Sequence, residues 1–269
     1  MLVALTHIVS PAIRNCELTY RDREPIDYDR AVEQHAGYCQ LIRTCGARVV
    51  ELHVNGDYPD STFIEDTAVV MDEIAVMANI GVASRQGEVD GIAAEMVRFR
   101  EVTRVQSPAT LDGGDVLVMG KRVFVGQSPR TNDAGIDSLS WILSHFGYEV
   151  LPVRLHDCLH LKSACTALDD ETILANPEWL DLESFNGFRT IDVPRDEPWA
   201  ANVLGMNRAI LMHSGFIKTI DLVTALGYTV VSTDISELLK AEAGMTCSSI
   251  LFQHPVHVHD TRITGRDYA

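Results

Sequence analysis

Short β-branched clusters that come in pairs constrain the fold of this chain more than any other feature. The run VLVMGKRVFVG places Gly120 and Lys121 between residues 116–119 and 122–125, which predicts two strands joined by a hairpin turn. Further strands are expected at residues 48–54, 68–71, 74–77, 148–153, 209–212, 228–231 and 248–252. Helical spacing predicts helices at residues 28–45, 89–99, 132–146, 216–226 and 235–242. A purely parallel doubly wound sheet needs no hairpins, so the alternation predicts an α/β chain of another kind.

The order of these elements suggests a repeated unit. Two strands followed by a helix and another strand recur along the 269 residues, and five such units would average about 54 residues each, near the length of known repeats. Sequence similarity between the units is too weak to prove a repeat. No linker, low-complexity tract or charge block interrupts the chain, so we expect one catalytic domain over residues 1–269.

Charge excludes some classes of partner. Lysine and arginine total 22 against 38 for aspartate and glutamate, which gives a net charge of −16. Such a chain repels polyanions, so nucleic acid and acidic membrane surfaces are poor candidates for partners. A cationic small molecule fits this charge, although most acidic chains are acidic only for solubility.

The sequence also predicts the compartment. It shows no basic leader and no apolar run of the ~18 residues that a membrane span needs, so we expect a soluble cytoplasmic protein. Its six cysteines are scattered without a C-x-x-C pair, which favours free thiols in a reducing compartment.

Cys247 is the first candidate for chemistry, in the segment AEAGMTCSSILF just ahead of an expected strand. A cysteine beside an apolar strand is more often a small core residue, so a nucleophile needs a partner. His160, in HDCLHLKSACTAL, could be that partner because folding alone brings a thiol and its proton-transfer group together. His156 competes for this role, and either histidine could be purely structural.

Two acidic segments are further candidates. In LDGGDVLVMG, Asp112 precedes paired glycines that allow close backbone approach, and its carboxylate could support an imidazole; the alternative is an ordinary turn. In GDYPDSTFIEDTAVV, four carboxylates crowd together, which is costly in a desolvated site unless a cation lies among them. The alternative is a solvated acidic loop. The four are Asp57, Asp60, Glu65 and Asp66.

Two arginines and the histidines near the C-terminus are the remaining candidates for binding residues. Arg85 and Arg130 each follow a strand pattern and could bind a carboxylate through the guanidinium fork, although most arginines in an acidic protein balance surface charge. The tail carries His254, His257 and His259, but terminal histidines without a fixed geometry seldom form a site, so we assign no metal ligand.

Five motifs together resemble the dimethylarginine dimethylaminohydrolase family. They occur in the family's order and span nearly the whole chain: F-I-E-D-T-A at 63–68, L-D-G-G-D-V-L at 111–117, V-G-x-S-x-R-T-N at 125–132, L-H-L-K-S at 159–163 and T-C-S-S at 246–249. The resemblance implies the pentein fold of guanidine-modifying enzymes, a barrel-like propeller of five ββαβ units around a central site. That expectation agrees with the paired strands and the unit length.

The resemblance also implies roles for individual residues. Cys247 matches the nucleophile, His160 the general acid/base, Asp112 the carboxylate that supports the histidine, and Asp66 the acid that grips the substrate guanidinium. The remaining matches concern substrate binding. They are Asp60 and Glu65 lining or ordering the pocket, Arg85 and Arg130 clamping the substrate carboxylate, Leu18 in the mobile lid, and Glu242 near the substrate amino group.

One departure from related enzymes bears on the reaction. Arginine deiminases and amidinotransferases resemble this chain but carry H-x-D, whereas here His160 is followed by Leu161 and Lys162. The missing carboxylate leaves room for N-methyl groups, and 269 residues leave little space for the helical insertion of a typical deiminase.

The resemblance therefore implies hydrolysis of mono- and asymmetric dimethylarginine to citrulline and an amine, through a covalent thiouronium on Cys247. It implies no cofactor; zinc could inhibit by capturing Cys247 and His160. The alternatives are an arginine deiminase or other guanidine hydrolase and, from another class, a non-catalytic binder of cationic amino acids. A homodimer is left open.

Overall fold

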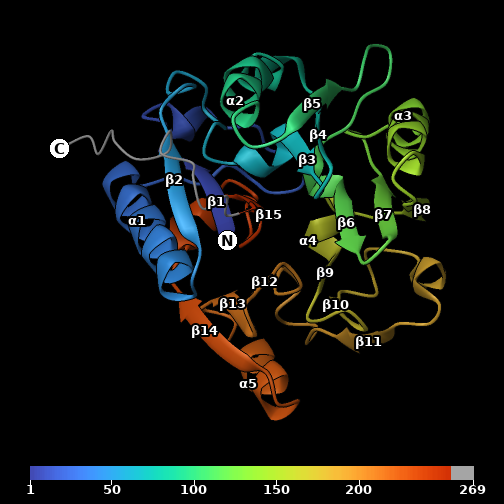
Figure 1. Cartoon of the computed structure of the whole chain (residues 1–269). Coiled ribbons are helices and arrows are strands. Elements are labelled where there is room, and N and C mark those ends of the chain that lie inside the picture. Colours follow the sequence, from blue (N-terminus) through green and yellow to red (C-terminus); the bar gives the residue numbers. More distant parts are fainter. Residues whose placement is uncertain (256–269) are drawn as a thin grey trace.

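Five three-stranded sheets form the framework in the computed structural model, which describes residues 1–255. In each sheet the middle strand pairs antiparallel with one neighbour and parallel with the other. Successive sheets follow one another around the molecule in chain order (Figure 1). The sheets are β15(Ile250–Gln253)-β1(Leu2–His7)-β2(Arg48–Leu52), β3(Ala68–Val70)-β4(Ile74–Met77)-β5(Glu101–Arg104), β6(Val116–Met119)-β7(Arg122–Gln127)-β8(Glu149–Arg154), β9(Cys165–Ala167)-β10(Thr172–Ala175)-β11(Arg189–Asp192) and β12(Leu204–Met206)-β13(Ala209–His213)-β14(Thr229–Thr233).

Helices form the crossovers between parallel strands and lie on the outside (Figure 1). Four sheets have an α-helix in this position: α1 (Tyr28–Thr44), α2 (Glu88–Met96), α3 (Asp133–Ser144) and α5 (Ile217–Ala225). The fourth sheet has only a 3-10 turn there, η5 (Leu182–Phe185). Side chains of Asp27 and Asn132 accept hydrogen bonds from the first turns of α1 and α3, which fixes where these helices begin.

Shorter helical pieces lie in the connecting loops. They are α4 (Leu161–Ala164), α6 (Ser236–Leu239), η1 (Ile13–Asn15), η2 (Ile64–Thr67), η3 (Ala83–Arg85) and η4 (Gly113–Asp115).

The two ends of the described chain close the ring together. β15 pairs antiparallel with β1, with Leu2 opposite Gln253 and Leu5 opposite Ile250. In Figure 1 the two strands lie side by side at opposite ends of the colour scale. The first sheet is therefore completed only when the last strand arrives.

The core is divided among neighbouring sheets. Five buried clusters each join residues of two successive sheets; one of them packs Leu5 of β1 against Met77 of β4 and Ile92 of α2. Burial of these apolar side chains against both neighbours stabilises each sheet in its place. Among residues 1–255, no helix is long and apolar enough to cross a membrane.

Most expected elements exist, with shifted boundaries. The hairpin is confirmed: β6 and β7 pair across Gly120 and Lys121, and Gly120 has φ +61°. The expected strand at 48–54 ends at Leu52, the helix at 89–99 ends at Met96, and the helix at 235–242 shrinks to α6. The strand expected at 248–252 begins only at Ile250, because the two residues before it belong to the loop of Cys247.

Several short elements were not expected: β1, β5, β9, β10, β11, β12 and α4. Runs of three to six residues carry little periodicity of their own, and here they become strands because a neighbouring strand supplies hydrogen bonds. His257 and His259 lie outside the described residues.

Candidate active site

The loops that lead into the first strands of four units meet near the centre. Asp66 precedes β3, Asp112 precedes β6, His160 lies shortly before β9, and Cys247 precedes β15. Equivalent loops of a circular arrangement end at the same place, so residues far apart in sequence become neighbours. Asp66, His160 and Cys247 line one cavity of about 20 Å³, together with Arg85, Arg130 and others.

His160 is held by carboxylates on both sides. Its Nε2 lies 3.3 Å from Asp112 Oδ2, and its Nδ1 lies 3.8 Å from Asp66 Oδ1. Burial disfavours the charged imidazole, but Asp66, Asp115 and Asp112 outweigh this effect and raise the pKa of His160 to about 9. The ring is therefore protonated at neutral pH, and Nδ1 is the nitrogen left for proton transfer.

The paired glycines explain why these groups come so close. A Cβ on Gly113 would lie 2.1 Å from the carbonyl oxygen of Glu65, and a Cβ on Gly114 would lie 2.6 Å from both Asp66 Oδ1 and His160 Nδ1. The Gly114 N–H also donates to Asp66 Oδ1 at 3.0 Å. Only glycine fits at either position without displacing the site.

Asp66 is a charged carboxylate in a buried setting. Burial would raise its pKa, yet His160, Arg85 and Arg130 overcome burial and lower the pKa to about 2. Arg85 Nη1 donates to Asp66 Oδ2 at 2.6 Å. The same guanidinium pairs with Glu88 at 3.0 Å and donates to the carbonyl of Phe63, also at 3.0 Å. Arg85 would have to exchange a partner before it could bind a substrate carboxylate.

Arg130 differs from Arg85 in having a donor to spare. Its side chain is buried, and its Nη1 has no hydrogen-bond partner among the described residues, with Asp112 Oδ2 3.7 Å away. A buried N–H without a partner is costly and marks a place for an acceptor. An anionic group entering the cavity would supply one.

Cys247 is partly exposed and sits in a crowded loop. Its Sγ accepts a hydrogen bond from Gly244 N–H at 3.2 Å, and its carbonyl accepts one from Glu65 N–H, also at 3.2 Å. Burial, with Glu65 and Asp66 nearby, raises the pKa of Cys247 to about 12. Burial and the two carboxylates therefore disfavour the thiolate form of Cys247.

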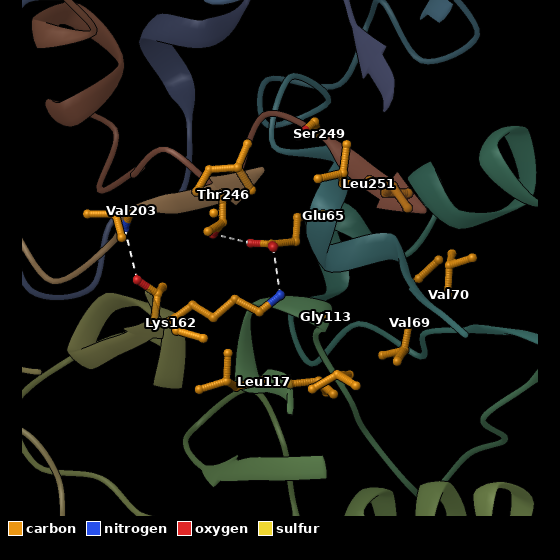
Figure 2. A pocket seen from close by; sticks show the side chains of 18 residues that line it. Glu65, Val69, Val70, Gly113, Leu117, Lys162, Val203, Thr246, Ser249 and Leu251 are labelled. Carbon is orange, nitrogen blue, oxygen red and sulfur yellow. Dashed lines mark hydrogen bonds and ion pairs between the residues drawn. The ribbon is translucent and has the colours of Figure 1, made fainter. Parts of the chain in front are cut away.

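Neighbouring residues of the same loops point to a second cavity, of about 270 Å³. Figure 2 shows Lys162 and Thr246 both reaching the Glu65 carboxylate. Lys162 Nζ donates to Glu65 Oε1 and Thr246 Oγ1 donates to Glu65 Oε2, both at 2.6 Å. Glu65 thus lines this second cavity and is not among the residues that line the one containing Cys247.

A loop at residues 17–21 covers the cavity. Asp60 accepts the N–H of Glu17 at 3.2 Å, and burial raises the pKa of Asp60. Glu242 accepts backbone N–H groups of residues 19, 20 and 21 at 2.5 to 3.1 Å. Leu18 is partly buried on the apolar cluster that Cys247 also contacts. Glu242 therefore lines the cavity and holds the loop at residues 17–21 in place by hydrogen bonds.

Two residues that support the site were not predicted from the sequence. Asp115, fully buried, accepts the N–H of Leu161 at 3.0 Å and so fixes the turn after His160; burial raises its pKa to about 6. Asn202 accepts the Thr246 N–H at 2.9 Å and steadies the Cys247 loop. The second aspartate of D-G-G-D was visible as a signal, whereas nothing marked Asn202.

His156 does not join the site. It is exposed and bonds Asp181 at 2.8 Å, outside the cavity. All six cysteines are free, as expected.

Asp66, Asp112 and His160 place ligand atoms within 4.8 Å of one another, so they could in principle hold a metal ion. Arg85 and Arg130 already bring positive charge to the same carboxylates. A metal ion would have to displace that charge, and our interpretation of a site without metal stays a prediction.

A thiol, a carboxylate-supported imidazole and a buried acid around one cavity define a cysteine-dependent enzyme class for cationic substrates. A family model described as N,N dimethylarginine dimethylhydrolase, eukaryotic, matches residues 15–177. The chain therefore belongs to the dimethylarginine dimethylaminohydrolase family.

Individual relatives agree with this assignment. The chain is 33% identical over 228 residues to the N(G),N(G)-dimethylarginine dimethylaminohydrolase of Pseudomonas aeruginosa, covering 84% of this chain and 90% of the relative. It is 36% identical over 248 residues to that of Streptomyces coelicolor, covering 92% and 95%. A structure of the Pseudomonas aeruginosa protein, a mutant complexed with citrulline, superposes with a TM-score of 0.89 at 31% identity over 93% of this chain and 98% of that one.

Proposed function

We propose that this protein hydrolyses N-ω-monomethylarginine and asymmetric dimethylarginine to citrulline and methylamine or dimethylamine. The observation that carries the proposal is one cavity that holds Cys247, His160 and Asp66 in a chain of this family. The citrulline complex of the Pseudomonas aeruginosa relative supports the product.

Binding of the substrate prepares the nucleophile. A guanidinium about 4 Å from Cys247 Sγ would favour the thiolate by roughly 4 kcal/mol at an effective dielectric of ~20, or about 3 pKa units. This offsets much of the effect that raises the thiol pKa to about 12. The thiol proton leaves to solvent, and the substrate's own charge stabilises the thiolate that attacks it.

The chemistry then proceeds in two halves. The thiolate forms a C–S bond to the guanidinium carbon, His160 Nδ1 gives its proton to the departing amine, and the C–N bond breaks, leaving an S-alkylthiouronium on Cys247. The now neutral His160 takes a proton from water, the oxygen bonds to the same carbon, and the C–S bond breaks. The remaining hydroxyl proton leaves to solvent as the carbonyl of citrulline forms, citrulline and the thiolate are released, and His160 is protonated again.

Other residues bind and orient the substrate in this proposal. Asp66, with Asp60 nearby, holds the guanidinium. Arg130 binds the α-carboxylate through its unpaired Nη1, and Arg85 joins it after exchanging one of its present partners. Three residues act at the edge of the site. Glu65 orders the loop of Cys247, and Leu18 belongs to the lid. Glu242 holds the lid and lies near the substrate amino group.

Lys162 favours methylated substrates over arginine itself. Deiminases of this superfamily resemble the chain but have an aspartate in its place, whereas Lys162 turns into the second cavity and pairs with Glu65. No second carboxylate therefore follows His160 to bind the distal nitrogen, and methyl groups can occupy that side.

The wider organisation is also part of the proposal. We assign the five sheets to a pentein propeller with pseudo-fivefold symmetry, formed by a single catalytic domain over residues 1–269. We further expect a cytoplasmic protein that uses no organic cofactor, with neither nucleic acid nor membrane as a partner. A homodimer remains compatible with this proposal.

The test is incubation of the purified protein with arginine, monomethylarginine and both dimethylarginines, with citrulline and free amine measured. We expect citrulline and amine in equal amounts from mono- and asymmetric dimethylarginine. Cys247→Ser should lose at least about 1,000-fold in turnover, because a hydroxyl ionises far less readily. Cys45→Ser, at a half-exposed thiol after α1, is the matched control and should stay active.

Citrulline from arginine alone would overturn the proposal in favour of a deiminase. Binding of all four compounds without any turnover would favour the non-catalytic binder. Activity that survives in Cys247→Ser would refute the nucleophile.

A further inference from the structure

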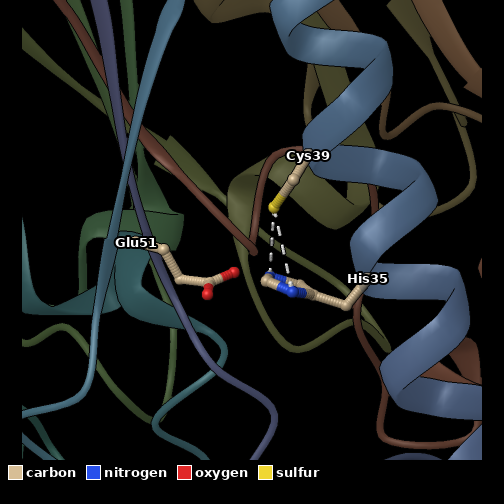
Figure 3. Close-up of side chains that lie close together, drawn as sticks. All are labelled: His35, Cys39 and Glu51. Atoms are coloured by element: carbon tan, nitrogen blue, oxygen red, sulfur yellow. Dashed lines mark hydrogen bonds between the residues drawn. The ribbon is translucent and has the colours of Figure 1, made fainter. Parts of the chain in front are cut away.

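A second group of potential metal ligands lies outside the active site, between α1 and β2. His35 and Cys39 are four residues apart on α1 and so lie on the same face of the helix, while Glu51 extends toward them from β2 (Figure 3). One ligand atom from each side chain lies within 4.8 Å of the other two. None of the three residues lines the cavity that contains Cys247.

The two ring nitrogens of His35 share one distant hydrogen-bond partner. The ring is 3% exposed, and its only hydrogen-bond partner among residues 1–255 is the Cys39 sulfur, 3.8 Å from Nδ1 and 3.9 Å from Nε2. A neutral imidazole has one donor and one acceptor nitrogen, and a single distant thiol satisfies at most one of them well.

The nearby His7 shows what a fully satisfied buried histidine looks like in this region. Its Nδ1 lies 2.9 Å from the carbonyl oxygen of Ile8, and its Nε2 accepts the N–H of Asn55 at 3.0 Å. Both ring nitrogens of His7 are used by the backbone. His35 has no such backbone partners, which separates it from an ordinary structural histidine.

The spacing suits a tetrahedral ion. Zinc–sulfur and zinc–nitrogen bonds of about 2.3 and 2.1 Å at a tetrahedral angle place sulfur and nitrogen roughly 3.6 Å apart. The observed distances of 3.8 and 3.9 Å between Cys39 Sγ and the His35 nitrogens are close to this value. Small side-chain adjustments would bring both atoms into coordination.

Glu51 is the third potential ligand, and it lies where the ligand group is open to solvent. Its side chain is 39% exposed, and its ion pair with the exposed His53 is long, at 3.9 Å. Such a pair is weak and easily exchanged for a metal ion. An ion could therefore enter past Glu51 to reach the two buried ligands.

We propose that His35, Cys39 and Glu51 bind one zinc-class divalent ion that ties α1 to β2, with solvent as the fourth ligand. Thiolate and imidazole ligands select late first-row metals over magnesium and calcium. When the ion binds, the Cys39 thiol releases its proton to solvent as the sulfur–metal bond forms. The thiolate and the Glu51 carboxylate then balance the two positive charges, so the buried site is neutral.

The test uses metal-free protein carrying Cys247→Ser, which removes the active-site thiol as a competing ligand. Titration with Co²⁺ should give thiolate-to-cobalt charge-transfer absorption that saturates at one ion per chain, and Zn²⁺ should displace the Co²⁺ and raise Tm. Adding Cys39→Ala should abolish the band and the Tm shift. Adding Cys45→Ala instead, just past the end of the same helix, should preserve both.

A second variant keeps the proposal testable if Cys39→Ala disturbs the fold. Glu51→Gln changes a partly exposed side chain and should keep the band while weakening Co²⁺ binding roughly tenfold or more. Absence of the band in the parent, its survival in Cys39→Ala, or unchanged affinity in Glu51→Gln would each overturn the three-ligand site. These outcomes do not depend on whether the protein hydrolyses methylarginines.

Discussion

His160 turns its Nε2 toward Asp112 Oδ2 at 3.3 Å, and both side chains are buried. Carboxylates raise the pKa of His160 to about 9, so loss of one negative charge should lower it. In Asp112→Asn the proton needed by the leaving amine would be lost at lower pH. We expect a fall in kcat of roughly 100-fold or more and an alkaline limb shifted to lower pH, both read from the pH dependence of citrulline formation.

The matched control is Asp181→Asn, which removes a carboxylate from the exposed His156 at 2.8 Å. It should leave the pH profile unchanged. If the alkaline limb of the pH profile does not shift in Asp112→Asn, then Asp112 does not stabilise the protonated form of His160.

The two buried arginines should respond differently to truncation. Arg130 has an unpaired Nη1, so Arg130→Ala should raise KM roughly 10- to 100-fold with a smaller change in kcat, as expected for a lost hydrogen bond to a charged group. The guanidinium of Arg85 instead balances the negative charges of Asp66 and Glu88. Arg85→Ala should therefore lower the free energy of unfolding by roughly 3–5 kcal/mol, measured by urea denaturation. An unchanged KM in Arg130→Ala would contradict the proposal that Arg130 binds the substrate α-carboxylate.

Lys162 should contribute to stability in a pH-dependent way. Burial already raises the pKa of Glu65, and Lys162→Met would leave that carboxylate without its cation. We expect a loss of roughly 3 kcal/mol of unfolding free energy at neutral pH. The loss should shrink as pH falls through the folded-state pKa of Glu65, because the protonated acid needs no partner.

Urea denaturation at several pH values measures this effect. The double variant Glu65→Gln with Lys162→Met is the control and should recover most of the lost stability. A loss that is independent of pH, or no recovery in the double variant, would contradict this role of the pair.

Glu242 should govern how readily the loop at residues 17–21, the proposed lid, opens. The residue has φ +59°, an unfavourable backbone conformation for a non-glycine residue, and its carboxylate binds three successive lid N–H groups. In Glu242→Ala these donors lose their acceptor, so the lid should be released. Trypsin should then cleave after Arg21 and Arg23 faster than in the native protein, and KM should rise.

Glu24→Ala tests the specificity of this effect. Glu24 is an exposed residue just past the loop at residues 17–21, and its carboxylate lies 3.9 Å from the guanidinium of Arg21. Its removal should leave both the cleavage rate and KM unchanged. Equal cleavage rates in Glu242→Ala and in the native protein would show that the carboxylate does not hold the lid.

Sequence patterns predicted the repeated unit well where strands were long or joined by a tight turn. The hairpin at Gly120 is an example, because its turn chemistry is local. The strands of the fourth unit were missed, since β9 and β11 are three and four residues long and no α-helix separates β10 from β11. Such strands form through pairing with neighbours, which no local pattern records.

The sequence by itself determined the chemistry available to this protein: a thiol, an imidazole and clustered acids in motifs with a family's order. Only the tertiary structure decided how each charge is used. Asp66 lines one cavity, whereas the adjacent Glu65 lines another. Arg85 forms ion pairs with Asp66 and Glu88. Among the described residues, Arg130 Nη1 has no hydrogen-bond partner. The reason is physical: desolvation and charge compensation depend on what packs around a group, and that is fixed only when the five sheets close into a ring.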